Sequence, residues 1–217
     1  MKVIAVAQQK GGVGKTMIAI HLAGDAEQDN PATVIIELDK QGTASLWSER
    51  RGSERTPHVM RVESNALAKA LRALRDGGAD LAILDLPGAH SPAITPAIKA
   101  ADLVLIPTRA NEIDIAASAE TLAACHRLNK RYAFVLTFTE PGSGKTRDAK
   151  DAREARQALQ DAGHPVADAN IARRQVFVDA VAAGKTAREI EPAGKGAAEI
   201  ARLWAWTKTQ LETGEHD

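Results

Sequence analysis

The chain has 217 residues, 44% of them apolar, and its 28 basic and 28 acidic side chains give no net charge. This length suits one domain built around a single core, and no run approaches the roughly 20 apolar residues of a membrane span. A neutral chain has no overall field that would draw it to nucleic acid or to an anionic membrane, so such binding would need a local basic patch. The single cysteine, Cys125, excludes an internal disulfide and an intrachain metal cluster, and together with the lack of a secretory signal it indicates a cytoplasmic protein.

Short apolar runs rich in branched side chains predict strands that are buried on both faces. They occupy residues 2–7, 34–38, 81–85, 103–106 and 133–138. Segments with helical spacing lie between them, for example at 17–28, 66–75 and 113–128. This alternation predicts an α/β fold, a doubly wound, mostly parallel sheet with helices on both faces. We expect residues 1–217 to form one domain, with a frayed tail at 212–217.

A glycine-rich loop follows the first predicted strand and opens the first long helix. Its sequence is Lys10-Gly11-Gly12-Val13-Gly14-Lys15-Thr16. Glycines let successive backbone amides turn toward phosphate oxygens, and the helix adds its positive end. Lys15 is expected to reach the β and γ phosphates, and the Thr16 hydroxyl to bind Mg²⁺. The expected nucleotide-binding residues are Lys10, Gly11, Gly12, Val13, Gly14, Lys15, Thr16 and Met17.

Lys10 is a second lysine that a loop of this kind does not need for holding a nucleotide within one chain. The stretch KGGVGKT resembles the deviant Walker A motif of the ParA/MinD family, and the resemblance extends along nearly the whole chain, closest to short, ParF-like partition proteins. It implies a P-loop NTPase fold that uses ATP and Mg²⁺, with Lys10 crossing a dimer interface to the partner's ATP. A cation that arrives in trans can neutralise charge developing on the transferred phosphoryl group. Hydrolysis would then need two ATP-loaded subunits.

Two carboxylates stand at the end of the second predicted strand, in VIIELDKQG. The segment resembles a family segment with two aspartates followed by Pro-Gln-Gly, but Glu37 replaces the first aspartate and Lys40 the proline. The resemblance makes Asp39 the candidate catalytic residue, which would orient the attacking water. Alternatively, Asp39 caps a helix that begins near Thr43. The two departures keep open a nucleotide switch that scarcely hydrolyses ATP.

Two further strand ends complete the expected site. Asp85 ends LAILD, which resembles a Walker B segment, so it is expected to hold Mg²⁺ directly or through water. An ordinary strand-end aspartate is the alternative, and Leu86-Pro87-Gly88 stands where the family usually has Thr-Pro-Pro. Thr137 occupies a strand end where relatives often place an adenine-contacting Asn or Thr.

The family resemblance also implies binding of DNA without sequence preference, through basic residues near the carboxyl-terminal side of the dimer. Lysines and arginines on an ordinary solvated face are the alternative. The candidates are Lys145, Arg147, Arg173, Arg174, Lys185, Lys195, Arg202 and Lys208.

The last predicted helix has an apolar face that could pack in the core or lie on a membrane. The face is formed by Ile200, Leu203, Trp204, Thr207 and Leu211. Acidic residues follow it where a membrane anchor would carry basic ones, so we expect core packing and no membrane binding.

The resemblance predicts an ATP-dependent DNA segregation ATPase that dimerises on ATP. It would hydrolyse ATP weakly alone, respond to DNA and to a ParB-like partner, and associate with the nucleoid. One alternative is an ATPase that positions a protein cargo, such as a microcompartment, through an adaptor. The weakly hydrolysing switch or scaffold is another. A metabolic ligase or electron-transfer ATPase of the same superfamily would need a substrate motif or cluster cysteines, which this sequence lacks.

Replacing Lys15 tests the phosphate loop. We expect Lys15→Ala to abolish ATP binding, because the ammonium group supplies the loop's main charge-assisted contact with the β and γ phosphates. Titration calorimetry with MgATP measures the effect, and an unchanged affinity would refute the phosphate role.

Overall fold

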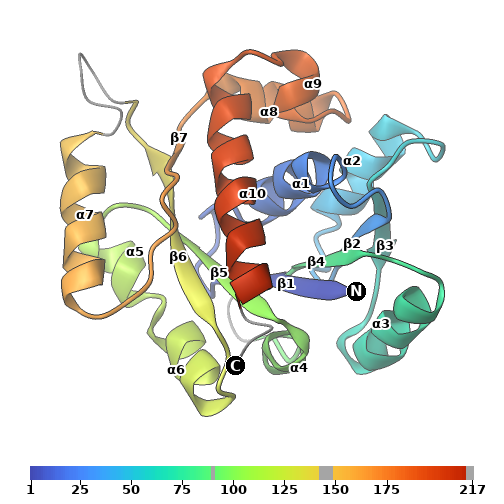
Figure 1. The fold of residues 1–217 in the computed structure, drawn as a ribbon, viewed down its shortest axis with the longest axis horizontal. Coiled ribbons are helices and arrows are strands. Elements are labelled where there is room, and N and C mark those ends of the chain that lie inside the picture. Colours follow the sequence, from blue (N-terminus) through green and yellow to red (C-terminus); the bar gives the residue numbers. More distant parts are fainter. Residues whose placement is uncertain (89–90, 142–148, 214–217) are drawn as a thin grey trace.

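The computed structural model describes residues 1–88, 91–141 and 149–213. Within these ranges the strands are β1 (Lys2–Val6), β2 (Thr33–Glu37), β3 (His58–Arg61), β4 (Leu81–Asp85), β5 (Leu103–Thr108), β6 (Tyr132–Thr139) and β7 (Ile171–Ala172). They form one sheet in the order β3-β2-β4-β1-β5-β6-β7, and every described pairing is parallel (Figure 1). Strand β1 lies at the centre of the sheet between the fully buried strands β4 and β5, and the phosphate loop begins a few residues after β1 ends.

The helices lie on both faces of this sheet. Their bounds are α1 (Lys15–Ala26), α2 (Thr43–Arg51), α3 (Leu67–Asp76), α4 (Ile94–Ala100), α5 (Glu112–Ala116), α6 (Ala119–Arg127), α7 (Lys150–Asp161), α8 (Gln175–Ala182), α9 (Ala187–Ile190) and α10 (Lys195–Thr213), with a 3₁₀ turn at Ser64–Ala66. Successive strand residues point to opposite faces, so Ile4 and Val6 join the core under α1, α2, α8 and α10. Val3 and Ala5 join the core under α3, α4, α6 and α7. The doubly wound fold predicted from the sequence is confirmed.

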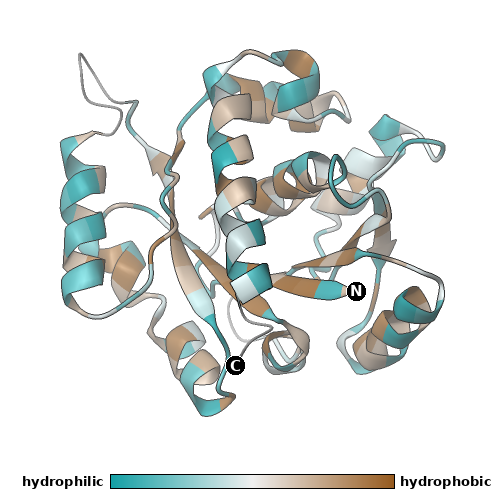
Figure 2. Cartoon of the chain, in the orientation of Figure 1, coloured by the Kyte–Doolittle hydropathy of each residue, from teal (hydrophilic) through white to brown (hydrophobic). Residues whose placement is uncertain are grey.

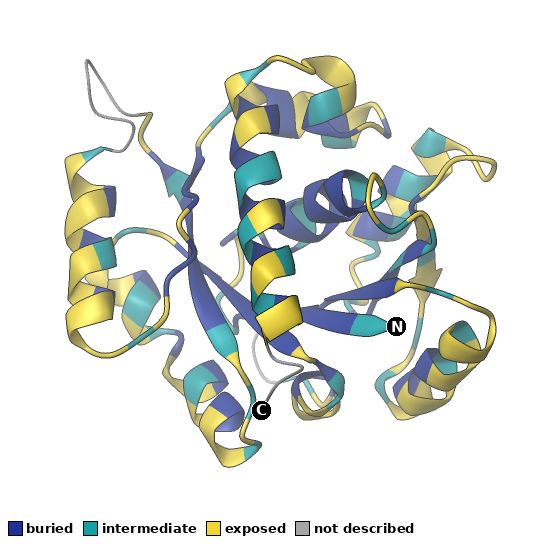
Figure 3. Cartoon of the chain, in the orientation of Figure 1, coloured by how far each residue is buried: buried dark blue, intermediate teal, exposed yellow. Residues whose placement is uncertain are grey.

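Hydropathy and burial follow this layering. The central strands are apolar and buried, while the helices turn polar, exposed residues outward (Figures 2 and 3). Strand β3 escaped the sequence analysis because it lies at an edge with one neighbour, and His58, Met60 and Arg61 are exposed. A strand in that position needs no continuous apolar run. Strand β7 is two residues long and has no pattern to detect.

The segment 113–128, expected as one helix, is two. Helix α5 ends at Ala116 and α6 begins at Ala119. The Ser118 amide and hydroxyl both donate to the Ile115 carbonyl, at 3.0 Å and 2.5 Å. In a continuous helix that carbonyl would accept from the amide of Ala119. Apolar spacing does not register a local side-chain hydrogen bond of this kind, so it predicted one continuous helix across the break between α5 and α6.

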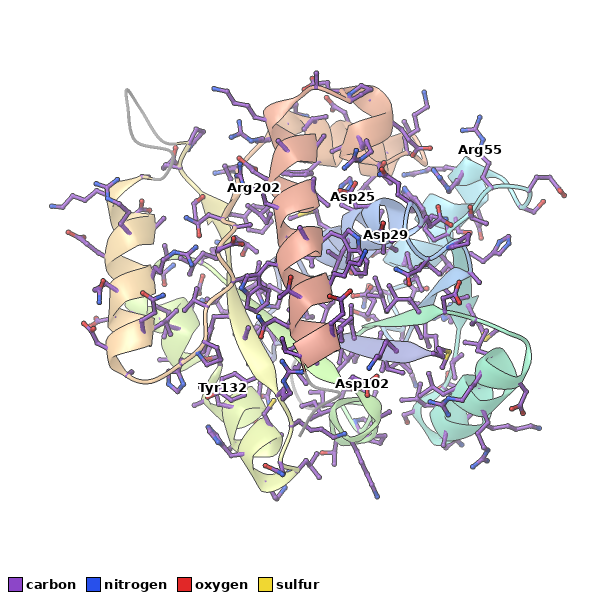
Figure 4. The ribbon with its side chains drawn as sticks, viewed as in Figure 1. Asp25, Asp29, Arg55, Asp102, Tyr132 and Arg202 are labelled. Carbon is purple, nitrogen blue, oxygen red and sulfur yellow. The ribbon has the colours of Figure 1, made fainter. Side chains whose placement is uncertain are left out.

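Helix α10 packs in the core, as its sequence predicted. The residues of its apolar face are all buried, and all of them except Thr207 join the cluster that α1 also lines. The Trp204 indole donates to Asp29 at 2.8 Å, and Figure 4 shows Asp25 and Asp29 on one side of this helix with Arg202 on the other. The helix includes residues 212 and 213, and the rest of the expected frayed tail lies outside the described residues. Throughout the described ranges, no helix combines the length and apolar character needed to cross a bilayer.

Helix α2 is fastened to the turn between α8 and α9. The Trp47 indole donates to the Lys185 carbonyl at 2.9 Å, and Arg51 donates to the Gly184 carbonyl at 3.2 Å. Gly184 has a φ of +65°, and a Cβ there would lie 2.4 Å from the Arg51 amide nitrogen. This contact is between backbones, so a side chain at position 184 would force the two elements apart.

The contact at Gly184 predicts a stability effect. We expect Gly184→Ala to lower the free energy of unfolding by about 3 kcal/mol, because left-handed strain and overpacking act together. Gly78→Ala is the matched control: it has a φ of +83° with no atom within 4 Å of the added Cβ, so only strain of about 1 kcal/mol is expected. Urea unfolding measures both, and equal losses would contradict the packing argument.

Candidate nucleotide-binding site

The glycine-rich loop turns directly into the buried helix α1. Gly14 is the residue before the helix and has a φ of +91°. A Cβ there would lie 3.2 Å from both Met17 Cε and Phe138 Cε2, so the position needs glycine for its conformation and for its close neighbours. Because α1 runs through the core, the loop's amides are presented from a fixed base.

A cavity of about 590 Å³ opens in front of this loop. Of the residues predicted from the sequence, it is lined by Gly11, Gly12, Gly14, Lys15, Thr16, Met17 and Asp39, and further by Gln41, Pro87, Gly88 and Phe138. The structure therefore brings most of the expected nucleotide-binding residues to one hollow. Val13, also expected there, is buried behind the loop.

Lys15 lies at the base of the cavity with little exposure. Its Nζ donates to the Lys10 carbonyl at 3.1 Å. Burial lowers the pKa of Lys15, while the charges of Asp85 and Asp39 act to raise it. The lysine is thus held between the loop backbone and two carboxylates, at the place where a phosphate group would bring further negative charge.

Asp85 is fully buried at the end of β4, next to Val6 of β1. Burial raises the pKa of Asp85 to about 7, and Glu37 and Asp39 add to the increase, while the Thr16 hydroxyl and Lys15 oppose it. Neither carboxyl oxygen has a hydrogen-bond partner of good geometry among the described residues. A buried carboxylate left unsatisfied beside a threonine hydroxyl fits a hard cation that binds oxygen ligands, such as Mg²⁺.

The Asp85 carboxylate and the Thr16 hydroxyl would hold a metal only together with other ligands. In the described part of the chain, no cluster of three or more His, Cys, Asp and Glu side chains could hold an ion by itself. Nucleotide phosphates and water can supply the remaining oxygens that Mg²⁺ requires.

Asp39 and Glu37 have different tasks in the structure. Asp39 lines the cavity, half-buried, and its Oδ1 accepts from the Gln41 amide at 3.0 Å. Glu37 is fully buried and accepts from the amides of Ala44 and Ser45, at 2.7 Å and 3.3 Å, at the start of α2. The alternative in which Asp39 caps this helix is therefore wrong, because the longer side chain of Glu37 reaches those amides instead.

Thr137 lies beneath the loop and is fully buried. Its hydroxyl is 2.9 Å from the Val13 carbonyl and 3.2 Å from the Thr108 carbonyl. The expected adenine contact does not agree with this position, because the side chain ties β6 to the phosphate loop and is closed off from the cavity. The next residue, Phe138, lines the cavity with a φ of +50°.

A second cavity of about 440 Å³ adjoins the first, sharing Met17 and Phe138. Phe177, Val178 and Val181 of α8 make it mainly apolar. Sequence reasoning missed Phe138, whose only signal was its place at the end of the last long strand.

Lys10 lies at the rim and does not line the cavity. Its ammonium group forms an ion pair with Asp114 of α5, and its side chain is 38% exposed. The bonds and charges of Lys10, Asn111 and Arg109 hold the pKa of Asp114 below its usual range, although burial acts to raise it. Asp114 was not among the predicted residues, because the two partners are 104 positions apart and no local pattern joins them.

Residues 4–187 match the model of the CobQ/CobB/MinD/ParA nucleotide binding domain. The chain belongs to this family. It is 32% identical over 205 residues to Maintenance of carboxysome distribution protein A of Gloeobacter kilaueensis, covering 88% of this chain and 89% of the relative. It is 29% identical over 232 residues to the chromosome-partitioning ATPase Soj of Thermus thermophilus, covering 92% of each. The fold superposes on the septum site-determining protein MinD of Pyrococcus horikoshii, solved with Mg-ADP, with a TM-score of 0.78 at 16% identity over 98% of each chain.

The basic residues expected on a ParA-family DNA surface are only partly together. Arg173, Arg174 and Lys195 line one cleft of about 330 Å³ beside the start of α10. Arg174 is ion-paired with Glu199, and Lys208 with Asp29 at 3.2 Å, so both are partly neutralised. The others are spread out: Lys185 is exposed between α8 and α9, Arg202 is half-buried on α10, and Lys145 and Arg147 lie outside the described residues.

The unsatisfied carboxylate makes a test possible. We expect Asp85→Asn to leave the ligand-free protein at least as stable as the wild type, because it removes a buried charge that lacks a partner. Stabilisation by MgATP over ATP alone should disappear, and turnover should fall by about 100-fold or more. Thermal unfolding with and without Mg²⁺ measures the first two effects.

Asp76→Asn, at the exposed end of α3, makes the same charge change away from the cavity and serves as the control. An Asp85→Asn protein that keeps the full Mg²⁺-dependent stabilisation would contradict the metal role.

Proposed function

We propose that the chain is an ATP-dependent DNA segregation ATPase that dimerises around two MgATP molecules. One observation carries the proposal: the loop holds two lysines, of which Lys15 lines the cavity and Lys10 lies outside it at the exposed rim. A single subunit uses Lys15 for its own phosphates. Lys10 lies outside its own subunit's cavity and, once it leaves Asp114, would contact a nucleotide bound by another subunit.

The cavity residues have separable roles in hydrolysis. The loop amides and Lys15 bind the phosphates. Thr16 on the cavity wall would hold Mg²⁺, and Asp85, which is buried beside Thr16 and does not itself line the cavity, would hold it directly or through water. Mg²⁺, when bound, would supply positive charge that offsets the negative charge of the triphosphate. Among the described residues that line the cavity, Asp39 is the one with a carboxylate, and it orients the attacking water and accepts its proton.

The base of the nucleotide occupies the apolar cavity that continues from the phosphate site. Met17 and Phe138 line both cavities, so they stand where the ribose and base leave the loop. The Phe138 ring offers a face for stacking. In this arrangement Thr137 acts on the nucleotide through the loop, which it supports from below.

DNA binding is proposed to use the exposed basic residues on the side of β7, α8 and α10. Arg173 and Lys195 share one cleft, and Lys185 is exposed at the end of α8. Contacts to phosphates by such residues are independent of sequence and weaken with salt. The protein would thus reside in the cytoplasm on the nucleoid, with a ParB-like partner that triggers hydrolysis and releases it.

A second candidate is the positioning of a protein cargo through an adaptor. The similarity to a protein named for carboxysome distribution favours it, because that relative is slightly more similar in sequence than Soj. The two functions share the nucleotide and DNA cycle and differ in the partner. Pull-down of the protein products of neighbouring genes, with ATP present, distinguishes a DNA-binding partner from an adaptor.

Sizing with different nucleotides tests the proposed cycle. With a slowly hydrolysed ATP analogue and Mg²⁺, the protein should elute as a dimer that retains unrelated duplex DNA; with ADP it should elute as a monomer that does not. ATP turnover should be slow alone and rise with DNA and partner. A protein that stays monomeric with the analogue at high concentration would contradict the dimer mechanism, and a dimer that hydrolyses ATP negligibly under all conditions would favour the switch or scaffold.

Lys10→Ala separates binding from turnover. We expect nearly unchanged affinity for MgATP, since Lys10 does not line the cavity, and turnover reduced by about 1,000-fold, as for loss of a trans-acting cation. Lys69→Ala, an exposed lysine of α3, is the control for removing one surface charge. Calorimetry and steady-state phosphate release give the two quantities, and a fully active Lys10→Ala protein would remove the trans role.

A further inference from the structure

The ion pair of Lys10 joins the phosphate loop to a buried carboxylate. Asp114 is 2% exposed, and it accepts from Lys10 and from the Asn111 side-chain amide at 3.2 Å. The Asp114 amide in turn donates to Asn111 Oδ1 at 2.9 Å, so the Asn111 side chain caps the start of α5. The carboxylate is thus fixed by its own helix, and Lys10 is the flexible member of the pair.

Arg109 lies beside the same carboxylate. Its Nε is 3.8 Å from Asp114 Oδ2, too long for a hydrogen bond. Its Nη2 donates to the Gly12 carbonyl at 2.7 Å, and its guanidinium group stands 5.4 Å from the centre of the Phe138 ring. The side chain is 49% exposed. Arg109 therefore holds the loop while it lies within about 1 Å of a full bond to Asp114.

We propose that Asp114 is a positioning residue that stores Lys10 in a cis-paired, inactive position, and that Arg109 replaces Lys10 on Asp114 when Lys10 moves to a second subunit. The proposal rests on the proposed dimer function and adds its control. While its ammonium group is paired with Asp114, Lys10 is held against helix α5 of its own subunit and its positive charge is largely offset. Dimerisation then includes an exchange of counter-ions on one buried carboxylate.

The exchange has a physical reason. Removing Lys10 from Asp114 without a substitute would leave a buried negative charge without a strong partner, which is destabilising. Arg109 is the cation placed to compensate, and closing the gap of about 1 Å between its Nε and Asp114 also shifts the Nη2 atom that holds the Gly12 carbonyl. Release of Lys10 is in this way coupled to a change in contacts of the phosphate loop itself.

The Asp114→Asn variant tests the storage role. The amide side chain keeps the size and the contact with Asn111 but binds an ammonium group weakly, so Lys10 is released more easily. With the ATP analogue, half-maximal dimerisation should occur at an about tenfold lower protein concentration than in the wild type, equivalent to about 1.4 kcal/mol. Partner-independent turnover should rise as well. Analytical ultracentrifugation and phosphate release measure the two effects.

Glu112→Gln, an exposed carboxylate of the same helix, is the matched control and should leave both quantities unchanged. Weaker dimerisation of a normally folded Asp114→Asn protein would overturn the proposal, because it would mean that Asp114 supports Lys10 in its active position. Thermal unfolding establishes that the variants are folded.

The Arg109→Gln variant tests the exchange. With Asp114 present, loss of Arg109 should weaken dimerisation, because the released carboxylate has no replacement cation. In the Asp114→Asn background the same change should have little effect. Equal effects in the two backgrounds would overturn the exchange, since the two residues would then act independently.

A readout in the nucleotide-free protein separates this proposal from the proposed function. Acetic anhydride labelling followed by peptide mass spectrometry should modify Lys10 several times faster in Asp114→Asn than in the wild type, with exposed Lys195 as the internal reference. Equal rates at Lys10 would refute the cis pair whether or not the protein dimerises. A faster rate in a protein that never dimerises would instead refute the proposed function and leave the pairing intact.

Discussion

The candidate site depends on a buried charge that the chain does not neutralise on its own. Asp85 is fully buried, and among the described residues its oxygens find no hydrogen bond of good geometry. Such a group is costly unless a cation or proton compensates it. It is tolerated because β4 and β1 are rigid central strands that hold it next to Thr16 and Lys15. The sheet thus holds a buried carboxylate without a compensating cation, and Mg²⁺ bound with a nucleotide can supply that positive charge.

Contacts around the phosphate loop fix the loop and Asp39 relative to Asp85. Thr137 bonds the loop backbone from β6, and Phe138 approaches Gly14 so closely that an added Cβ would lie 3.2 Å from its ring. Glu37 joins the end of β2 to the start of α2, so the chain between them, which contains Asp39, is fixed at both ends. Glu37, which replaces the family's first aspartate, therefore has a structural role at the start of α2, while Asp39 lines the cavity. This arrangement weakens the argument that Glu37 implies poor catalysis.

Residues whose roles follow from neighbours in the sequence were predictable, and those whose roles depend on distant partners were not. The apolar run at Leu81–Asp85 predicted β4 with its bounds correct, because a central parallel strand must be apolar throughout. The glycine-rich loop was predicted for a similar reason, since the spacing of its glycines and lysines, with a strand before it and a helix after it, defines it. Thr137 was placed at the right strand end but with the wrong contact, because its hydroxyl is used by a carbonyl 124 positions away.

Two lysines five residues apart in one loop have opposite environments, and in the proposed cycle this difference links the bound nucleotide to the second subunit. Lys15 is buried between carboxylates and the Lys10 carbonyl, so its position depends on the loop. Lys10 is paired with Asp114. Arg109 lies near the same carboxylate and donates a hydrogen bond to the Gly12 carbonyl. Lys15 donates a hydrogen bond to the Lys10 carbonyl. A phosphate that binds Lys15 would therefore change a contact of the Lys10 backbone. Because these contacts share one short segment, the proposed cycle predicts that nucleotide binding in the cavity changes how readily Lys10 leaves Asp114.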